Sequence, residues 1–315
     1  MIYDTVYKDQ TAVAVENDAL RFLFLPETGA SIASILWKRE NRELLIQRPE
    51  LAYRRVAFGE RYVDAECSGI DDMFPTIDTC YYERFPWEGV KLADHGEVWN
   101  LPCDTDLSSS GVGFTTYGVR LPYLFHKKVA FLDDFTLRLK YRVENPTPFD
   151  MDFIWAGHMM LRAEPGVKVR VPKSCVEAQT VFSNSGRIGG YADQFSYPVF
   201  TDANGNQFDM SVMGKADGSS EKFYFKEKLT RGNCSVLYPD GLVLNISFPE
   251  SQVPYLGILH NRGGFMDMYN LFVEPCTAPF DRPDVARIMR KGSVVKANSN
   301  YSWYLDLGVM KGEKA

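Results

Sequence analysis

The chain has 315 residues, of which 45% are hydrophobic, 24% charged and 14% aromatic, and its formal net charge is −6. This composition is typical of a folded globular protein, and the length suffices for one large β domain or two ordinary domains. The sequence has no basic block and no apolar run of about 18 residues, which argues against nucleic acid and membranes as partners.

The first ten residues, MIYDTVYKDQ, lack the basic start and the apolar segment of a secretory signal, so we expect a cytoplasmic protein. The cysteines lack the close spacings of zinc or redox sites. We expect all six to be free thiols, at Cys67, Cys80, Cys103, Cys175, Cys234 and Cys276.

Short β-type segments dominate the chain from its start, over residues 12–15, 20–25 and 31–37. Residues 135–143 alternate apolar and polar side chains, which predicts a strand with one buried face. Residues 235–238 and 242–248 flank Pro239-Asp240-Gly241 and predict a hairpin, and residues 303–307 alternate again. The one helical segment is predicted over 284–291, between Pro283 and Gly292.

Residues 65–110 are rich in turns and make an unusually long connection, and long ordered loops are usually functional. The 24 glycines and 17 prolines are spread along the chain, and no repeat or linker divides it. We therefore predict a single all-β domain over residues 1–315, built as a large antiparallel β-sandwich.

Two of the four histidines lie in ordinary surroundings. His126 stands beside two lysines and is interpreted as a solvated strand end, whereas His260 precedes a Gly-rich turn and fits either a structural role or a pocket rim. The third, His95, lies next to Gly96 in the segment DHGEVWNLP, which also contains two acids and a tryptophan. Its surroundings make it a candidate for acid–base chemistry.

His158 and Glu274 each interrupt an apolar run. A polar residue in such a run must be hydrogen-bonded or face a cavity. Glu274 also precedes Pro275, which ends a strand, and a carboxylate walled by apolar residues is suited to base catalysis. A satisfied core histidine and a loop-capping glutamate are the alternatives.

Four segments in order resemble the aldose 1-epimerase (galactose mutarotase-like) superfamily: GIDDMFPTI at 69–77, DHGEVW at 94–99, WAGH at 155–158 and VEPCT at 273–277. The segment at 28–44 is similar to the family's opening hairpin. The resemblance spans the chain and implies a β-supersandwich with an open sugar cleft. It also implies that His95 assists at the sugar ring oxygen, that His158 is the general acid on that oxygen, and that Glu274 is the general base on the anomeric hydroxyl.

The sugar-binding residues are less well matched. We predict that the substrate contacts Asp72, Trp99, Asp193 and Asp202. For Trp99 the alternative to stacking on a sugar is a place in the core. The family's hydroxyl-binding aspartate has its nearest counterparts by position in Asp193 and Asp202, while Asp71 and Asp72 occupy the upstream motif where the family places a basic residue.

We therefore predict an aldose 1-epimerase that acts on a monosaccharide or sugar derivative by acid–base catalysis. This chemistry needs no redox step and no carbanion, so we expect no cofactor. The first alternative is a non-catalytic carbohydrate-binding protein with the same fold. The second is a metal enzyme with His95, His158 and Glu274 as ligands, which the absence of a closely spaced histidine pair disfavours. The identity of the sugar and the oligomeric state stay open.

Overall fold

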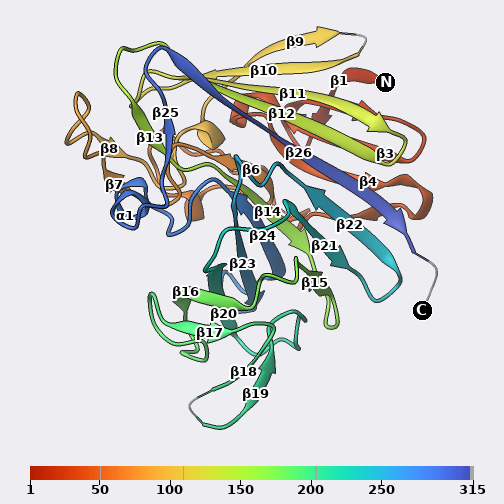
Figure 1. Ribbon diagram of the computed structural model, residues 1–315. Helices are drawn as coiled ribbons and strands as arrows, with labels where there is room; N and C mark the ends of the chain where they lie inside the picture. The colour runs from red at the N-terminus through yellow and green to blue at the C-terminus, as the bar shows by residue number, and fades with distance from the viewer. Residues whose placement is uncertain (50, 109, 203, 313–315) are drawn as a thin grey trace.

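Two large antiparallel sheets make up most of the computed structural model, which describes residues 1–49, 51–108, 110–202 and 204–312 (Figure 1). The first sheet contains, in spatial order, β1 (Ile2–Tyr7), β2 (Gln10–Glu16), β3 (Leu20–Leu25), β4 (Ser31–Trp37), β6 (Gly69–Met73), β14 (Ala156–Arg162), β24 (Tyr269–Cys276), β23 (Tyr255–Arg262), β20 (Ser219–Phe225), β16 (Glu177–Ser183) and β17 (Gln194–Ser196), with β5 (Arg42–Glu43) beside β4.

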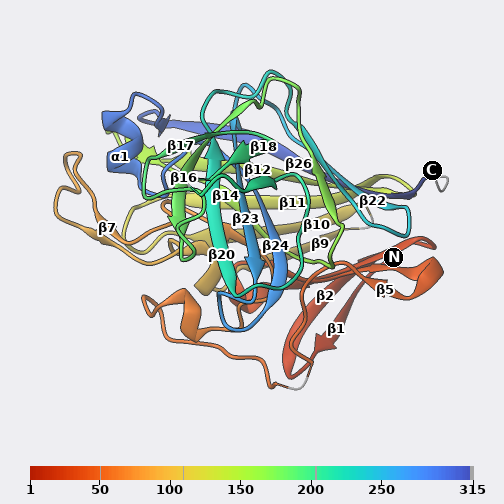
Figure 2. The same ribbon diagram turned by 90° about the horizontal axis from the view of Figure 1, so that it is seen from below.

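The second sheet contains β15 (Lys168–Arg170), β21 (Asn233–Leu237), β22 (Leu242–Ser247), β26 (Ser299–Lys311), β12 (Thr136–Asn145), β11 (Leu124–Asp133), β10 (Gly111–Tyr117) and β9 (Asp104–Ser108). Figure 2 shows β20, β23 and β24 of the first sheet crossing β11 and β12 of the second. This architecture is the β-sandwich predicted from the sequence, and all six cysteines in it are free.

Three two-stranded sheets complete the described structure: β7 (Cys80–Tyr81) with β8 (Lys91–Leu92), β13 (Met151–Phe153) with β25 (Ser293–Val295), and β18 (Val199–Thr201) with β19 (Gln207–Asp209). Short 3-10 turns lie at Pro26–Thr28, Lys38–Glu40, Tyr62–Asp64 and Val98–Asn100. Among the residues described, no helix has the length and apolar character to cross a membrane.

The core between the two sheets is strongly aromatic. Tyr141 of β12 stacks on Trp303 of β26 with ring centroids 5.2 Å apart, and Trp155 lies 5.1 Å from Tyr141 and 5.0 Å from Trp303. These rings belong to one hydrophobic cluster that runs through both sheets. Burial of this apolar area is the main force that holds the sandwich together.

The segments with alternating patterns form strands as predicted, because one face of each packs on this core. The predicted hairpin is β21–β22. The helix α1 (Pro283–Ile288) ends three residues earlier than predicted. The reason is that Arg290, at φ 57°, takes the left-handed conformation that terminates the helix, so the chain turns before it reaches Gly292.

The prediction of one long connection over residues 65–110 was wrong in part, because β6 lies within it as a central strand of the first sheet. All five residues of β6 are buried, so the strand lacks the alternation that marks a half-exposed strand. Its two adjacent aspartates point to opposite faces of the sheet. One of these faces packs on the second sheet, and the other carries the candidate site.

Candidate active site

A cavity of about 250 Å³ lies on the face of the first sheet that points away from the second sheet. Three neighbouring strands supply its polar floor: His158 from β14, Glu274 from β24 and Lys222 from β20. Tyr62 and His95, from connecting segments, form one wall. The volume is near the lower end of the range for small-molecule sites, so the ligand must be small.

His158 and Glu274 are neighbours because their strands are paired. Met159 lies opposite Val273 in the antiparallel register of β14 and β24, so His158 lies opposite Glu274 on the same face. The distance from His158 Nε2 to Glu274 Oε1 is 3.7 Å, and both side chains are buried. Glu274 Oε1 has no hydrogen-bond partner in the described structure. A potential base and a potential acid therefore meet at the floor of the cavity.

His95 is held by Tyr62 and Asp94. Its ring stacks on that of Tyr62, with centroids 4.1 Å apart and an interplanar angle of 4°, and its Nδ1 lies 2.7 Å from Asp94 Oδ1. The other carboxylate oxygen of Asp94 accepts a hydrogen bond from the backbone N–H of Tyr62 at 2.9 Å. Asp94 thus joins the segment of His95 to that of Tyr62 by hydrogen bonds, and the His95 ring is fixed in place.

The chain turns sharply at His95 and Gly96, which have φ angles of 60° and 75°. A Cβ atom at Gly96 would lie 2.3 Å from the carbonyl oxygen of Phe74, so only glycine fits there. The tight turn brings His95 over the end of β6, where its ring centroid lies 5.4 Å from that of His158.

Tyr62 contacts both histidines, and Asp71 holds its hydroxyl group. Its hydroxyl donates a hydrogen bond to the Asp71 carboxylate and lies 3.3 Å from His158 Nδ1. Because the phenol O–H donates to Asp71, the phenol oxygen is free to accept a hydrogen bond from His158 Nδ1–H. That arrangement leaves Nε2 as the His158 nitrogen nearest Glu274.

Burial controls the charges of these groups. It lowers the pKa of His158 well below its usual value, and the nearby His95 and Lys222 act in the same direction. Burial also raises the pKa of Glu274, while the positive charge of Lys222 opposes this rise. A protonated His158 in this cavity gives up its proton readily, and Glu274 is a stronger base than an exposed carboxylate.

Lys222 is a site residue that the sequence analysis missed. Its Nζ lies 2.9 Å from Glu274 Oε2 and 3.0 Å from Asp281 Oδ1. Tyr224, two residues along β20, donates its hydroxyl proton to Asp281. The signal was the same as for His158, because Lys222 is a charged residue directly before the apolar run Phe223-Tyr-Phe225. Tyr62 gave no comparable signal, since it lies in a short 3-10 turn.

Asp72 and Trp99, both predicted to bind substrate, lie outside the cavity lining. Asp72 points into the core between the sheets, where it pairs with Lys127 Nζ at 2.5 Å and accepts a hydrogen bond from Trp155 Nε1 at 2.9 Å. Trp99 packs edge-on behind Tyr62 with centroids 5.1 Å apart, and its Nε1 donates to the Asp94 carbonyl at 3.2 Å. For Trp99 the structure therefore favours the core alternative.

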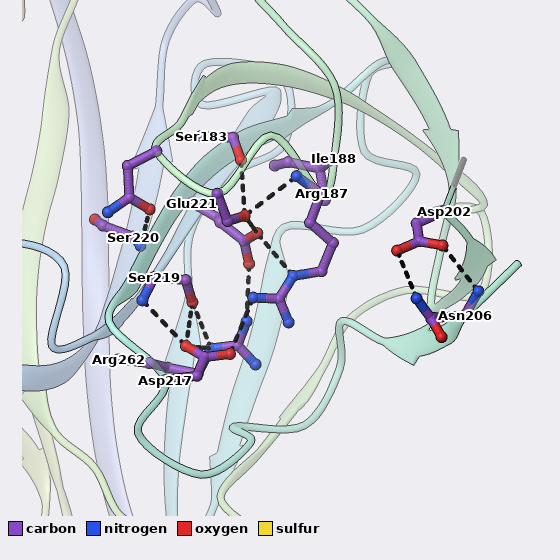
Figure 3. A network of polar contacts seen from close by, with 12 residues as sticks. Ser183, Arg187, Ile188, Asp202, Asn206, Asp217, Ser219, Ser220, Glu221 and Arg262 are labelled. Atoms are coloured by element: carbon purple, nitrogen blue, oxygen red, sulfur yellow. Dashed lines mark hydrogen bonds and ion pairs between the residues drawn. The ribbon is translucent and has the colours of Figure 1, made fainter. Parts of the chain in front are cut away.

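Asp193 and Asp202 also lie away from the cavity, because each closes its own turn. The Asp193 carboxylate accepts the backbone N–H of Gly190 at 2.8 Å. Asp202 accepts the backbone N–H groups of Asn204 and Asn206 at 2.9 Å and 2.8 Å. Figure 3 shows Asp202 beside Asn206, separate from the ionic cluster on β20.

The cluster on β20 consists of Glu221, Arg187, Arg262 and Asp217 (Figure 3). It lies on the face of β20 opposite the cavity, because Glu221 stands between Ser220 and Lys222, which both line the cavity. Arg187 and Arg262 each approach Glu221 to 3.0 Å. His260 is buried on the same side of the sheet, opposite Glu221 in the register of β20 and β23. This cluster fixes the strand that carries Lys222.

Within the described ranges, no group of three or more His, Cys, Asp or Glu side chains is arranged to hold a metal ion. His126 lies on the outer surface of β11, where its Nε2 is 3.2 Å from Glu144.

Comparison by sequence finds no matching family model and no matching curated protein. Comparison by structure finds many solved chains with this fold. The Slr1438 protein from Synechocystis sp. PCC 6803 superposes with a TM-score of 0.71 at 15% identity, over 98% of this chain and 100% of that one.

A galactose mutarotase-like protein from Clostridium acetobutylicum gives a TM-score of 0.66 at 12% identity, over 99% of both chains. A candidate aldose 1-epimerase from Escherichia coli K12 gives 0.64 at 15% identity, again over 99% of both chains. These similarities show that the chain has the galactose mutarotase-like fold over its whole length.

Proposed function

We propose that the protein is an aldose 1-epimerase, which interconverts the α and β anomers of a monosaccharide. The observation that carries the proposal is the buried pair of His158 and Glu274, 3.7 Å apart at the floor of a small cavity. The fold is consistent with this reaction, since solved structures with the same fold include a candidate aldose 1-epimerase.

In the proposed mechanism, His158 reacts in its doubly protonated form, with Nδ1–H donating to the Tyr62 oxygen and Nε2–H available for the ring oxygen. Glu274 accepts the proton of the C1 hydroxyl while His158 Nε2 gives its proton to the ring oxygen. The bond between C1 and the ring oxygen breaks, and C1 becomes an aldehyde. Rotation about the C1–C2 bond presents the other face of the aldehyde, and the same two groups return their protons as the ring closes. One proton is taken and one is given in each direction, so the enzyme ends each turnover unchanged.

The other residues of the cavity fit supporting roles. His95, held by Asp94 and Tyr62, is positioned to assist at the ring oxygen. The apolar walls, which include Phe182, Phe265 and Phe272, can contact the C–H faces of a sugar. We expect no cofactor to be required, because the reaction consists of proton transfers and one reversible ring opening.

The test is the mutarotation of freshly dissolved α-anomers from a panel of aldoses, followed by polarimetry or NMR exchange. Catalysis by the wild-type protein that is lost in Glu274→Gln supports the proposal. Sugar binding without any catalysis would instead support a carbohydrate-binding protein with this fold. Catalysis retained in Glu274→Gln would refute the residue roles.

A further inference from the structure

The contact between Lys222 and Glu274 spans a whole strand. Lys222 is on β20, Glu274 is on β24, and β23 runs between them. Gly257 of β23 lies opposite both Glu274 and Tyr224 in the strand register. A Cβ atom there would lie 3.1 Å from Glu274 Oε2 and 2.8 Å from the Tyr224 ring. Because Gly257 has no side chain, the space above β23 stays open, and the lysine reaches the carboxylate across it.

Glu274 lies among several ionisable groups from different elements. Lys222 is the cation that contacts it, while His158 lies 3.7 Å away on the other side. The remaining charged or titratable groups that act on Glu274 or on which it acts are His95, Asp281, Tyr224 and Cys276. Lys222 is the strongest of the influences that favour the ionised carboxylate over the neutral acid.

We propose that Lys222 is a positioning residue of the reaction, which holds Glu274 as an ionised carboxylate aimed at the C1 hydroxyl while Asp281 holds Lys222. The proposal rests on the proposed epimerase function. It follows from the geometry, because a carboxylate that is 1% exposed needs a nearby cation to stay charged. Lys222 Nζ occupies that place at 2.9 Å.

Asp281 keeps Lys222 paired with a negative charge during the reaction. When Glu274 takes the proton of the C1 hydroxyl, its charge disappears, and without a second partner Lys222 would be left as an unpaired buried cation. Asp281, 3.0 Å from Nζ, remains as its counter-ion, and the Tyr224 hydroxyl fixes Asp281 in turn. Lys222 therefore stays charged and in place, and it favours return of the proton to the sugar.

The test compares Lys222→Met with Lys222→Arg and with a matched control, Lys226→Met. Lys226 is a partly exposed lysine that directly follows the same strand, where it pairs with Glu177 at 3.1 Å. Two readouts are taken: the pH profile of kcat, and the titration of the Glu274 carboxylate by infrared difference spectroscopy against Glu274→Gln. Circular dichroism checks that each variant is folded.

In Lys222→Met, we expect the pH below which kcat falls to rise by about 1 to 3 pH units, the usual effect of one adjacent opposite charge. The Glu274 titration should move by the same amount, Lys222→Arg should restore most of it, and Lys226→Met should match the wild type. A Glu274 titration that stays in place in folded Lys222→Met overturns the proposal. If Lys222→Met does not fold, the same titration in Lys222→Gln decides, because glutamine keeps a polar side chain but removes the positive charge. The Glu274 titration should again shift upward, and an unmoved titration there overturns the proposal.

The two proposals can fail separately. A wild-type protein without epimerase activity refutes the proposed function, whereas the infrared titration still reports whether Lys222 controls the ionisation of Glu274. Activity with an unmoved titration refutes the role of Lys222 alone.

Discussion

Two carboxylates on opposite faces of the first sheet each form a buried pair with a lysine, and the two pairs differ in what surrounds them. Between the sheets, Lys127 pairs with Asp72 and also donates to the carbonyls of Gly29 and Ala30, at 3.3 Å and 2.8 Å. In the cavity, Lys222 pairs with Glu274, whose second oxygen has no partner and faces His158. Both pairs are buried, so burial alone does not mark a functional charge. What distinguishes Glu274 is that it lines a cavity, and this makes it the candidate for a functional charge.

We expect the largest effect, a loss of catalytic rate, when Glu274 of the cavity pair is replaced. Glu274→Gln keeps the shape and an acceptor oxygen but removes the base, so mutarotation should slow by at least about 100-fold. Sugar affinity should change far less, because the amide oxygen still accepts a hydrogen bond from the C1 hydroxyl. Polarimetry and calorimetric titration measure the two quantities.

His158→Gln serves as the partner experiment. Acid and base act in one step, so the double variant should be little slower than either single one. Independent, multiplying losses would contradict the concerted mechanism.

The core pair should respond in stability rather than in catalysis. Asp72→Asn leaves Lys127 as a buried cation without a charged partner, so the free energy of unfolding should fall by about 3–5 kcal/mol. Urea denaturation measures this loss, and kcat of the folded fraction should stay near the wild-type value. Glu274→Gln should destabilise the fold less than Asp72→Asn does, since Lys222 keeps Asp281 as its partner. Equal stability losses in the two variants would remove the contrast between the pairs.

Gly257→Ala should weaken the cavity pair without touching the core pair. The new methyl group would crowd Glu274 Oε2 and the Tyr224 ring, and a displaced base of this kind should lower kcat by about tenfold to 100-fold. Gly113→Ala is the control, because its Cβ would lie no closer than 3.8 Å to its neighbours. Similar kcat values for both variants would show that the open space above Gly257 is not needed for catalysis.

The last prediction concerns the pH dependence of stability, at a carboxyl group that belongs to neither pair. Burial raises the pKa of Asp71 to about 7 from 3.8, although the Tyr62 hydrogen bond opposes the rise. The native state therefore binds this proton more tightly than the unfolded state does, and Asp71 makes unfolding easier as the pH rises from about 4 to 7. Thermal unfolding at several pH values should show a steeper loss over this window in the wild type than in Asp71→Asn. Parallel curves would contradict the prediction.

Much of the sandwich could be predicted because strands with one face on the core alternate in sequence. β6 could not, since it is buried on both faces and its two aspartates resemble a polar loop. Asp71 and Asp72 illustrate why: adjacent residues of one strand serve opposite faces, and only the register decides which faces the cavity.

Part of the candidate site could be predicted from the sequence. The acids and the tryptophan around His95 marked one candidate, and the rule that a polar side chain within or beside an apolar run needs a partner or a cavity marked others. That rule identified His158 and Glu274, and applied to β20 it would have identified Lys222. The rule does not predict Tyr62, because this residue belongs to the candidate site through its stacking on His95. Asp193 and Asp202 were chosen by position along the chain, which does not reveal whether a loop bends toward the cavity or closes on itself, as both of theirs do.

The turn at His95 is tied to the rest of the protein before any ligand arrives. The His95 N–H donates to the Ile77 carbonyl at 2.6 Å, and the Glu97 N–H donates to the Phe74 carbonyl at 2.7 Å. The entropy of ordering this segment is therefore lost during folding and not during binding. If the protein binds a sugar as proposed, this wall of the cavity should already have its final shape when the sugar arrives.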